Sequence, residues 1–151
     1  MSKALFTLAL KSTIDKILAD YAQLQGINVI DLDDPVLSSE LFKSHADAVV
    51  WRLMTITPEP DPMYGVSFIV GARTVRDLSN YNLLSLVGGL SDTFDEGKSV
   101  PIYDYSGDTV SDRKGVMMVT QVIMDPQIEK DNSGVRFVQI DGKCIRAKTI
   151  S

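Results

Sequence analysis

One group of residues that could do chemistry is Gly97-Lys98-Ser99, which matches the end of a phosphate-binding loop. In such a loop, backbone N–H groups and the lysine hold the phosphates of a nucleotide. The loop also needs a glycine at the position that Asp92 occupies here, and a helix after the serine, which Pro101 opposes. We therefore interpret this group as a turn that carries a lysine.

A second group is acidic. Asp31, Asp33 and Asp34 have the spacing that opens a calcium loop, which also needs a glycine at its sixth position and a glutamate at its twelfth. Val36 and Phe42 occupy those positions, so an EF-hand is excluded. An aspartate-rich turn is the favoured interpretation, and a weak surface cation site is left open.

The sequence contains one histidine and one cysteine, His45 and Cys144. Either would need partners that only the fold could bring together to form a nucleophilic site. Basic residues near Cys144 could lower the pKa of its thiol, although a half-buried structural thiol is the commoner outcome. We predict no catalytic residue, no metal site and no cofactor. A single cysteine also excludes an intramolecular disulfide and suits a reducing cytosol.

The elements that would position these residues begin with a long helix over Ser2–Gln25, which Gly26 is placed to end. Apolar residues recur along it at three- and four-residue steps: Leu10, Ile14, Ile17, Leu18, Tyr21 and Leu24. Its start is apolar on more than one face through Leu5, Phe6 and Leu8, so that end is either buried deeply or meets a partner. A second helix is predicted from about Ser79 to Phe94, where Gly88-Gly89 either allows close backbone approach or splits the helix.

Strands are predicted where apolar residues alternate or cluster between turn residues. The predicted strands are Ala48–Thr57, Tyr64–Val75, Ile102–Tyr105 and Val116–Met124, and residues 27–46 are predicted to form a loop. Val116–Met124 is apolar on both faces, so it must be covered on both sides by its own domain or by a neighbour.

A C-terminal β-hairpin is the strongest local prediction. Val135–Ile140 and Lys143–Thr149 flank Asp141-Gly142, a two-residue step typical of a type I′ turn. In that register Phe137 lies opposite Arg146 on an outward face, and an aromatic side chain beside a guanidinium group is typical of a protein contact. A solvated amphipathic strand fits the composition equally well.

The order of these elements predicts one domain, residues 1–151, of the α+β class. We expect a mostly antiparallel sheet of about four to five strands, with the long N-terminal helix and the second helix packed on it. No apolar run is long enough to span a bilayer, and the apolar start lacks a cleavage site, so the chain is expected to be intracellular and unprocessed.

Charge is distributed unevenly along the chain. The net charge is +2 over residues 1–19, −10 over residues 20–112 and +3 over residues 113–151, within a total of −5. The acidic total argues against a sequence-independent grip on nucleic acid. The segregation is either an ordinary solvated surface or the basis of head-to-tail attraction between copies.

The order and length of the segments resemble those of the tail-terminator and neck (tail-completion) proteins of tailed bacteriophages. The resemblance lies in the long N-terminal helix, the strand Ala48–Thr57, the Pro-rich turn, and the runs YGVSFIVGARTV, NLLSLVGGL and VRFVQIDGKCIRAKTI. It implies a structural virion protein rather than an enzyme. Such proteins form a homo-hexameric ring on the end of the tail tube, stop its polymerisation and join the tail to the head.

The resemblance also implies the partners, which are other copies of the chain, the tail tube protein and the head–neck connector protein. It implies assembly in the host cytoplasm and a final place in the tail or neck of the virion. DNA would pass through the ring without specific binding, and no membrane is involved.

A ring closes through a repeated heterologous contact, in which two different surfaces of each copy meet. Our candidate residues for this contact are Phe137, Arg146, Lys148, Asp104 and Asp108. Charge reversal at Arg146 and Lys148 is expected to weaken self-association. The alternatives are a small cytoplasmic adaptor or inhibitor, and a small enzyme or ligand-binding domain that uses Cys144 or an aspartate cluster, either of them a monomer or dimer.

Overall fold

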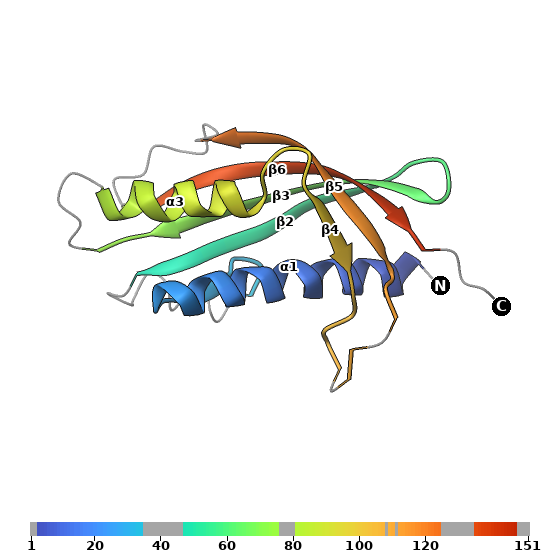
Figure 1. Cartoon of the computed structure of the whole chain (residues 1–151), viewed down its shortest axis with the longest axis horizontal. Helices are drawn as coiled ribbons and strands as arrows, with labels where there is room; N and C mark the ends of the chain where they lie inside the picture. Colours follow the sequence, from blue (N-terminus) through green and yellow to red (C-terminus); the bar gives the residue numbers. More distant parts are fainter. Residues whose placement is uncertain are drawn as a thin grey trace.

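The computed structural model describes residues 3–34, 47–75, 81–107, 109–110, 112–124 and 135–147. Over these residues the chain forms two helices and one six-stranded sheet (Figure 1). In chain order the elements are α1 Lys3–Gln25, β1 Asn28–Asp31, β2 Ala48–Pro58, β3 Met63–Arg73, α3 Tyr81–Thr93, β4 Ser99–Ile102, β5 Gly115–Met124 and β6 Val135–Arg146. The predicted α+β class is confirmed. Neither of these helices is both long and apolar enough to cross a membrane.

The strands lie in the order β1-β2-β3-β6-β5-β4. β1 is parallel to β2 and every other neighbouring pair is antiparallel, so the prediction of a mostly antiparallel sheet is confirmed with more strands than expected. The prediction of an uninterrupted loop over 27–46 is wrong at β1. This strand is only four residues long and pairs non-locally, Asn28 with Ala48, so the local sequence pattern does not reveal it.

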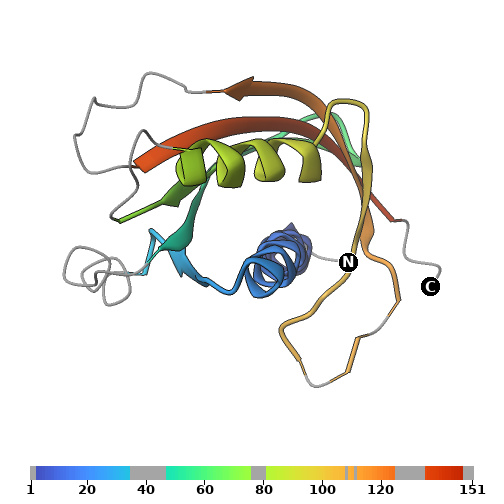
Figure 2. The same ribbon diagram turned by 60° about the vertical axis from the view of Figure 1, so that its left-hand side comes forward.

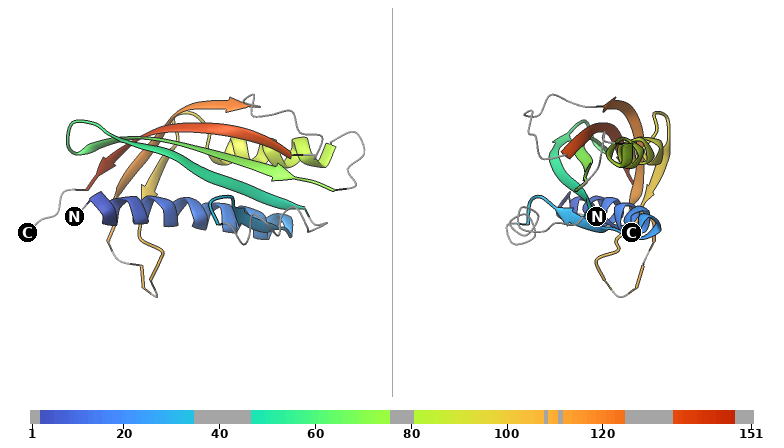
Figure 3. Two further views of the ribbon diagram at one scale, coloured as in Figure 1. Left: turned by 180° about the vertical axis from the view of Figure 1, so that it is seen from behind. Right: turned by 90° about the vertical axis from the view of Figure 1, so that its left-hand side faces the viewer.

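Both helices lie on the same side of the sheet. Figure 2 shows the sheet curling around α1, and Figure 3 shows α3 within the same curl. One core joins them: Phe6 stacks on Tyr64 of β3, and Phe94, just after α3, meets Phe68 edge to face. Neither described helix covers the opposite face of the sheet, which we call the convex face.

The first helix ends as predicted. Gly26 has φ +70°, its N–H donates to the Gln23 carbonyl, and the N–H of Ile27 donates to the Ala22 carbonyl. These two bonds form a Schellman motif, in which only glycine adopts the left-handed conformation at little cost. The apolar stripe is buried at Leu10, Ile14 and Leu18, whereas the prediction that Leu24 belongs to it is wrong because that side chain is exposed.

The C-terminal hairpin is absent from the described residues, because β6 runs straight through Asp141-Gly142. Asp141 pairs with Ser67 on one side and Gln121 on the other, and Gly142 pairs with Val66 and Val119. Gly142 also lacks the positive φ that a type I′ turn requires. β3 pairs with β6 from Val135 to Ile145 and β5 pairs with it from Val138 to Arg146, and this tertiary pairing on both sides overrides the local turn signal.

Gly88-Gly89 does not split the second helix. A Cβ atom at Gly89 would overlap the hydroxyl oxygen of Tyr21 and lie 3.0 Å from two of its ring carbons, whereas nothing lies within 4 Å of a Cβ atom at Gly88. The Tyr21 hydroxyl donates a hydrogen bond of 2.9 Å to the carbonyl of Leu86. Gly89 therefore allows α3 to approach α1, rather than the sheet.

Candidate subunit interface

The two strand residues chosen as interface candidates do not face each other. Residues of β6 alternate between the core and the convex face, so Val138, Ile140 and Cys144 are buried while Phe137 lies on the convex side. Phe137 and Arg146 therefore lie on opposite faces and near opposite ends of one strand. Their predicted pairing is wrong because it depended on the hairpin turn.

Phe137 packs within its own chain. A Cβ atom on Gly71, its partner across the strand pair, would lie 2.8 Å from Cδ1 of the phenyl ring, so the ring lies over the glycine. It is half-buried in a second, smaller apolar cluster on the convex face, with Ala48, Val50, Ile30, Leu32 and Val135. An aromatic side chain that covers a cross-strand glycine stabilises the pair and fixes its register.

The basic residues near the end of β6 are paired with acids of the β2–β3 turn. Arg146 Nη2 lies 2.5 Å from Asp61 Oδ1, and Lys143 Nζ lies 2.5 Å from Glu59 Oε1. The Arg146 side chain is only 19% exposed, whereas that of Asp61 is 75% exposed. The charge of Arg146 is therefore compensated within the chain.

Of the remaining candidates, Lys148 and Asp108 lie outside the described residues, as does His45. Asp104 lies in the loop between β4 and β5, where it accepts hydrogen bonds from the hydroxyl and the backbone N–H of Ser106. These two bonds, with a smaller contribution from the charge of Lys114, lower the pKa of Asp104. Asp104 therefore keeps its negative charge at neutral pH.

The loop that carries Asp104 is fixed to α1. The Ser12 hydroxyl accepts a bond from the backbone N–H of Tyr105, and the Thr13 hydroxyl both donates to the carbonyl of Tyr103 and accepts from its N–H. These bonds occupy the backbone N–H and carbonyl of Tyr103 and the backbone N–H of Tyr105. They explain why the short strand is Ser99–Ile102 and not the predicted Ile102–Tyr105.

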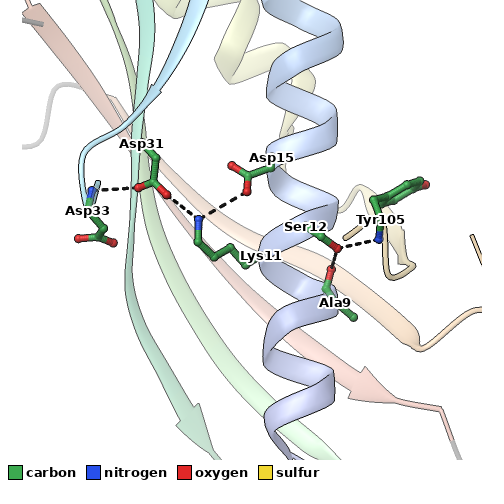
Figure 4. Close-up of polar contacts among 7 residues, drawn as sticks. All are labelled: Ala9, Lys11, Ser12, Asp15, Asp31, Asp33 and Tyr105. Carbon is green, nitrogen blue, oxygen red and sulfur yellow. Dashed lines mark hydrogen bonds and ion pairs between the residues drawn. The ribbon is translucent and has the colours of Figure 1, made fainter. Parts of the chain in front are cut away.

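The structure also brings together a polar cluster that the sequence analysis missed (Figure 4). Lys11 of α1 points between two carboxylates, with Nζ 2.6 Å from Asp31 Oδ2 and 3.5 Å from Asp15 Oδ2. The same ammonium group lies 4.6 Å from the centre of the Trp51 ring in β2. The i, i+4 spacing of Lys11 and Asp15 was the one local signal available.

This cluster joins elements rather than offering acid–base chemistry at neutral pH. Burial would lower the pKa of Lys11, but the hydrogen bond to Asp31 and the two negative charges outweigh it, so the pKa is raised and the lysine stays charged. Burial raises the pKa of Asp15, and the charge of Lys11 offsets part of that rise. The cluster ties α1 to β1 and β2.

The other chemical candidates have structural surroundings. Asp31 is bound to Lys11, and Asp33 lies 3.1 Å from Arg52. Gly97 has φ +81° in a turn that leads into β4 and not into a helix, as predicted for a lysine-bearing turn. Within the described ranges, no group of three His, Cys, Asp or Glu side chains is placed to hold a metal ion.

Cys144 is buried in the core. Burial raises the pKa of its thiol to about 12, so the expectation that nearby cations could lower that pKa is wrong. The thiol is neutral at physiological pH and is a poor nucleophile.

The convex face carries an apolar row near the C-terminal end of β6, in which Ile145 and Pro101 are exposed and the other two members are half-buried. Its members are neighbours across four strands: Met63, Ile145, Val116 and Pro101. We call these four residues the outer row. Ile145 is 52% exposed, and Met118, one step away on the same face of β5, is 47% exposed. β5 is therefore covered on its core side and open on its convex side.

A further apolar surface lies at the start of α1. Phe6 points into the core, while Leu5 and Leu8 are exposed. Of the two explanations considered for this apolar start, deep burial is wrong for these two leucines.

Compared with models of known protein families and with curated protein sequences, the chain matches none of them.

Proposed function

We propose that this chain is a structural subunit that acts by assembling with copies of itself into a ring, in the manner of a tail terminator of a tailed bacteriophage. The ring would cap the tail tube, stop its polymerisation and join the tail to the head–neck connector. The observation that carries the proposal is the outer row with Met118, because a contiguous group of exposed and half-buried apolar side chains on a strand face marks a contact with another protein.

Two further observations support assembly. The exposed leucines of α1 lie on the helix side of the sheet and the outer row lies on the convex side, so each copy offers two different apolar surfaces. Two different surfaces are what a heterologous, ring-closing contact requires. The α+β architecture, with a long first helix on a mostly antiparallel sheet, is also the one that the resemblance implies.

Ile145→Glu tests this proposal. It places a charge in the middle of the outer row, and we expect the association constant to fall by about tenfold or more, because desolvating an unpaired carboxylate opposes contact. Thr55→Glu is the matched control, since Thr55 is exposed on the same face of the sheet, where it pairs with Ser67, and lies outside the row.

Native mass spectrometry over a concentration series, with negative-stain imaging, measures both variants against the parent chain. Six-fold annuli that disappear in Ile145→Glu and persist in the control would support the proposal. A parent chain that stays monomeric at every concentration would overturn it and favour the monomeric adaptor or inhibitor.

A further inference from the structure

The strand β5 extends beyond its neighbour β4. Their pairing ends at Met118 with Ser99, and Val119 is still bonded to the backbone of Gly97 and Lys98. The last five residues, Thr120–Met124, which we call the β5 overhang, pair with β6 on one side only within the described part of the chain (Figure 1).

One side chain meets the open edge of the overhang. The carboxylate of Glu96, from the turn after α3, accepts a hydrogen bond of 3.1 Å from the backbone N–H of Val122. Met124, at the tip of the overhang, is 54% exposed, and Ile123 is exposed beside it. An open, apolar strand edge is a template for another strand, and proteins that do not use such an edge commonly block it with charge.

The surroundings of this edge are mostly acidic, although Lys98 lies in the same turn and donates a hydrogen bond from Nζ to the carbonyl of Thr93. Asp92, Asp95 and Glu96 are all exposed on α3 and the turn that follows it. A strand that pairs here is therefore favoured if it carries a positive charge near Glu96.

We propose that the β5 overhang binds the segment that follows β6 in a second copy of this chain, with Lys148 of that copy next to Glu96; this inference rests on the proposed self-assembly. The sequence pattern predicts that strand-forming residues continue to Thr149, whereas β6 ends at Arg146. Lys148 supplies the positive charge that the edge selects, and the β-branched Thr149 beside it favours a strand.

The two partners cannot meet within one copy. The N–H of Ala147 donates to the carbonyl of Lys114, just before β5, and Lys148 is the next residue. Val122 lies eight residues beyond Lys114, which corresponds to about 26 Å of strand. The end of β6 and the tip of the overhang also lie toward opposite ends of the long axis in Figure 1.

The exchange replaces one hydrogen bond by several. A carbonyl of the incoming strand accepts from the N–H of Val122, and the carboxylate of Glu96 turns outward to pair with the Lys148 ammonium. Each copy gives a strand at one end and receives one at the other, so the contact is heterologous and closes into a ring when the rotation between copies permits.

A charge-swap cycle on the full chain tests the inference by sedimentation velocity. We expect Glu96→Lys and Lys148→Glu each to lower the association constant about five- to tenfold, and the double variant to recover to within about twofold of the parent. Asp20→Lys is the control, because Asp20 is an exposed acid paired with Lys16 on α1, far from this edge. Thermal melting of each variant shows whether loss of the Glu96–Val122 bond alters the fold.

Single variants without effect, or a double variant that does not recover, would overturn the strand exchange. If Ile145→Glu still dissociates the assembly in that case, the proposed function stands without this contact. A parent chain that is always monomeric would overturn both.

Discussion

The adjacent glycines of α3 allow one feature of the packing to be tested with a built-in control. Alanine is favoured over glycine in a helix interior by about 1 kcal/mol, so Gly88→Ala, where a Cβ atom meets nothing within 4 Å, should raise the free energy of unfolding by roughly that amount. Gly89→Ala has the same favourable change in helix propensity. Its Cβ atom, however, would overlap the Tyr21 hydroxyl, and such overpacking typically costs about 1–3 kcal/mol.

The tyrosine cannot move aside freely, because its hydroxyl is bonded to the carbonyl of Leu86. For a chain of this size about 1 kcal/mol corresponds to roughly 2–4 °C in melting temperature, so Gly89→Ala should melt roughly 2–12 °C below Gly88→Ala. Differential scanning calorimetry measures the difference. In a Tyr21→Phe background the overlapping oxygen is gone, and the gap between the two alanine variants should narrow. Equal melting temperatures for the two variants in the parent background would refute the assigned helix–helix contact.

Three further tests concern the buried thiol of Cys144, the polar cluster around Lys11, and the strand glycines Gly71 and Gly65. Cys144 should resist iodoacetamide at neutral and mildly alkaline pH until denaturant is added, because the pKa of its buried thiol is about 12; mass spectrometry of the treated protein would show early labelling if the burial were wrong. Lys11→Met should lower the free energy of unfolding in urea by about 1–3 kcal/mol, since it leaves two carboxylates without their cation, whereas Lys16→Met in an exposed pair should change it by less than about 0.5 kcal/mol. Gly71→Ala should destabilise by about 2–4 kcal/mol because its Cβ atom would overlap a carbonyl oxygen of the next strand, while Gly65→Ala, with no neighbour closer than 3.8 Å, should be tolerated.

Local patterns in the sequence were sufficient where one periodic face decides the structure. The stripe of α1, its stop at Gly26 and the alternation of β3, with Val66, Phe68 and Val70 inward, could all be predicted. Each depends on burial of one face of a single element, and the sequence alone displays that face.

Non-local pairing accounts for what the sequence could not provide. Asp141-Gly142 has the composition of a turn, but β6 lies between β3 and β5, and nothing in its own residues reveals two distant neighbours. The error then carried over to the candidate interface. Removing a two-residue turn changes which residues share a face, so Phe137 and Arg146 separate.

The Lys11 cluster could not be found for a similar reason. Its members come from α1, β1 and β2, and only the packing of these three elements brings them within reach of one ammonium group. The outer row likewise depends on the register of four strands. A single-sequence pattern can predict that β5 is apolar on both faces, but not which face stays open.

The position of β6 has a consequence for how the chain matures in the cell. The strand order places β6 between a group of three strands from the first half of the chain and the pair β5-β4, and β6 is the last of the described strands to be synthesised. The two halves of the sheet therefore stay unjoined until residue 146 has left the ribosomal exit tunnel. Because these contacts span long sequence separations, closure is expected to be slow, and the nascent halves expose apolar edges that chaperones recognise. The complete sheet thus appears only after translation has passed this strand.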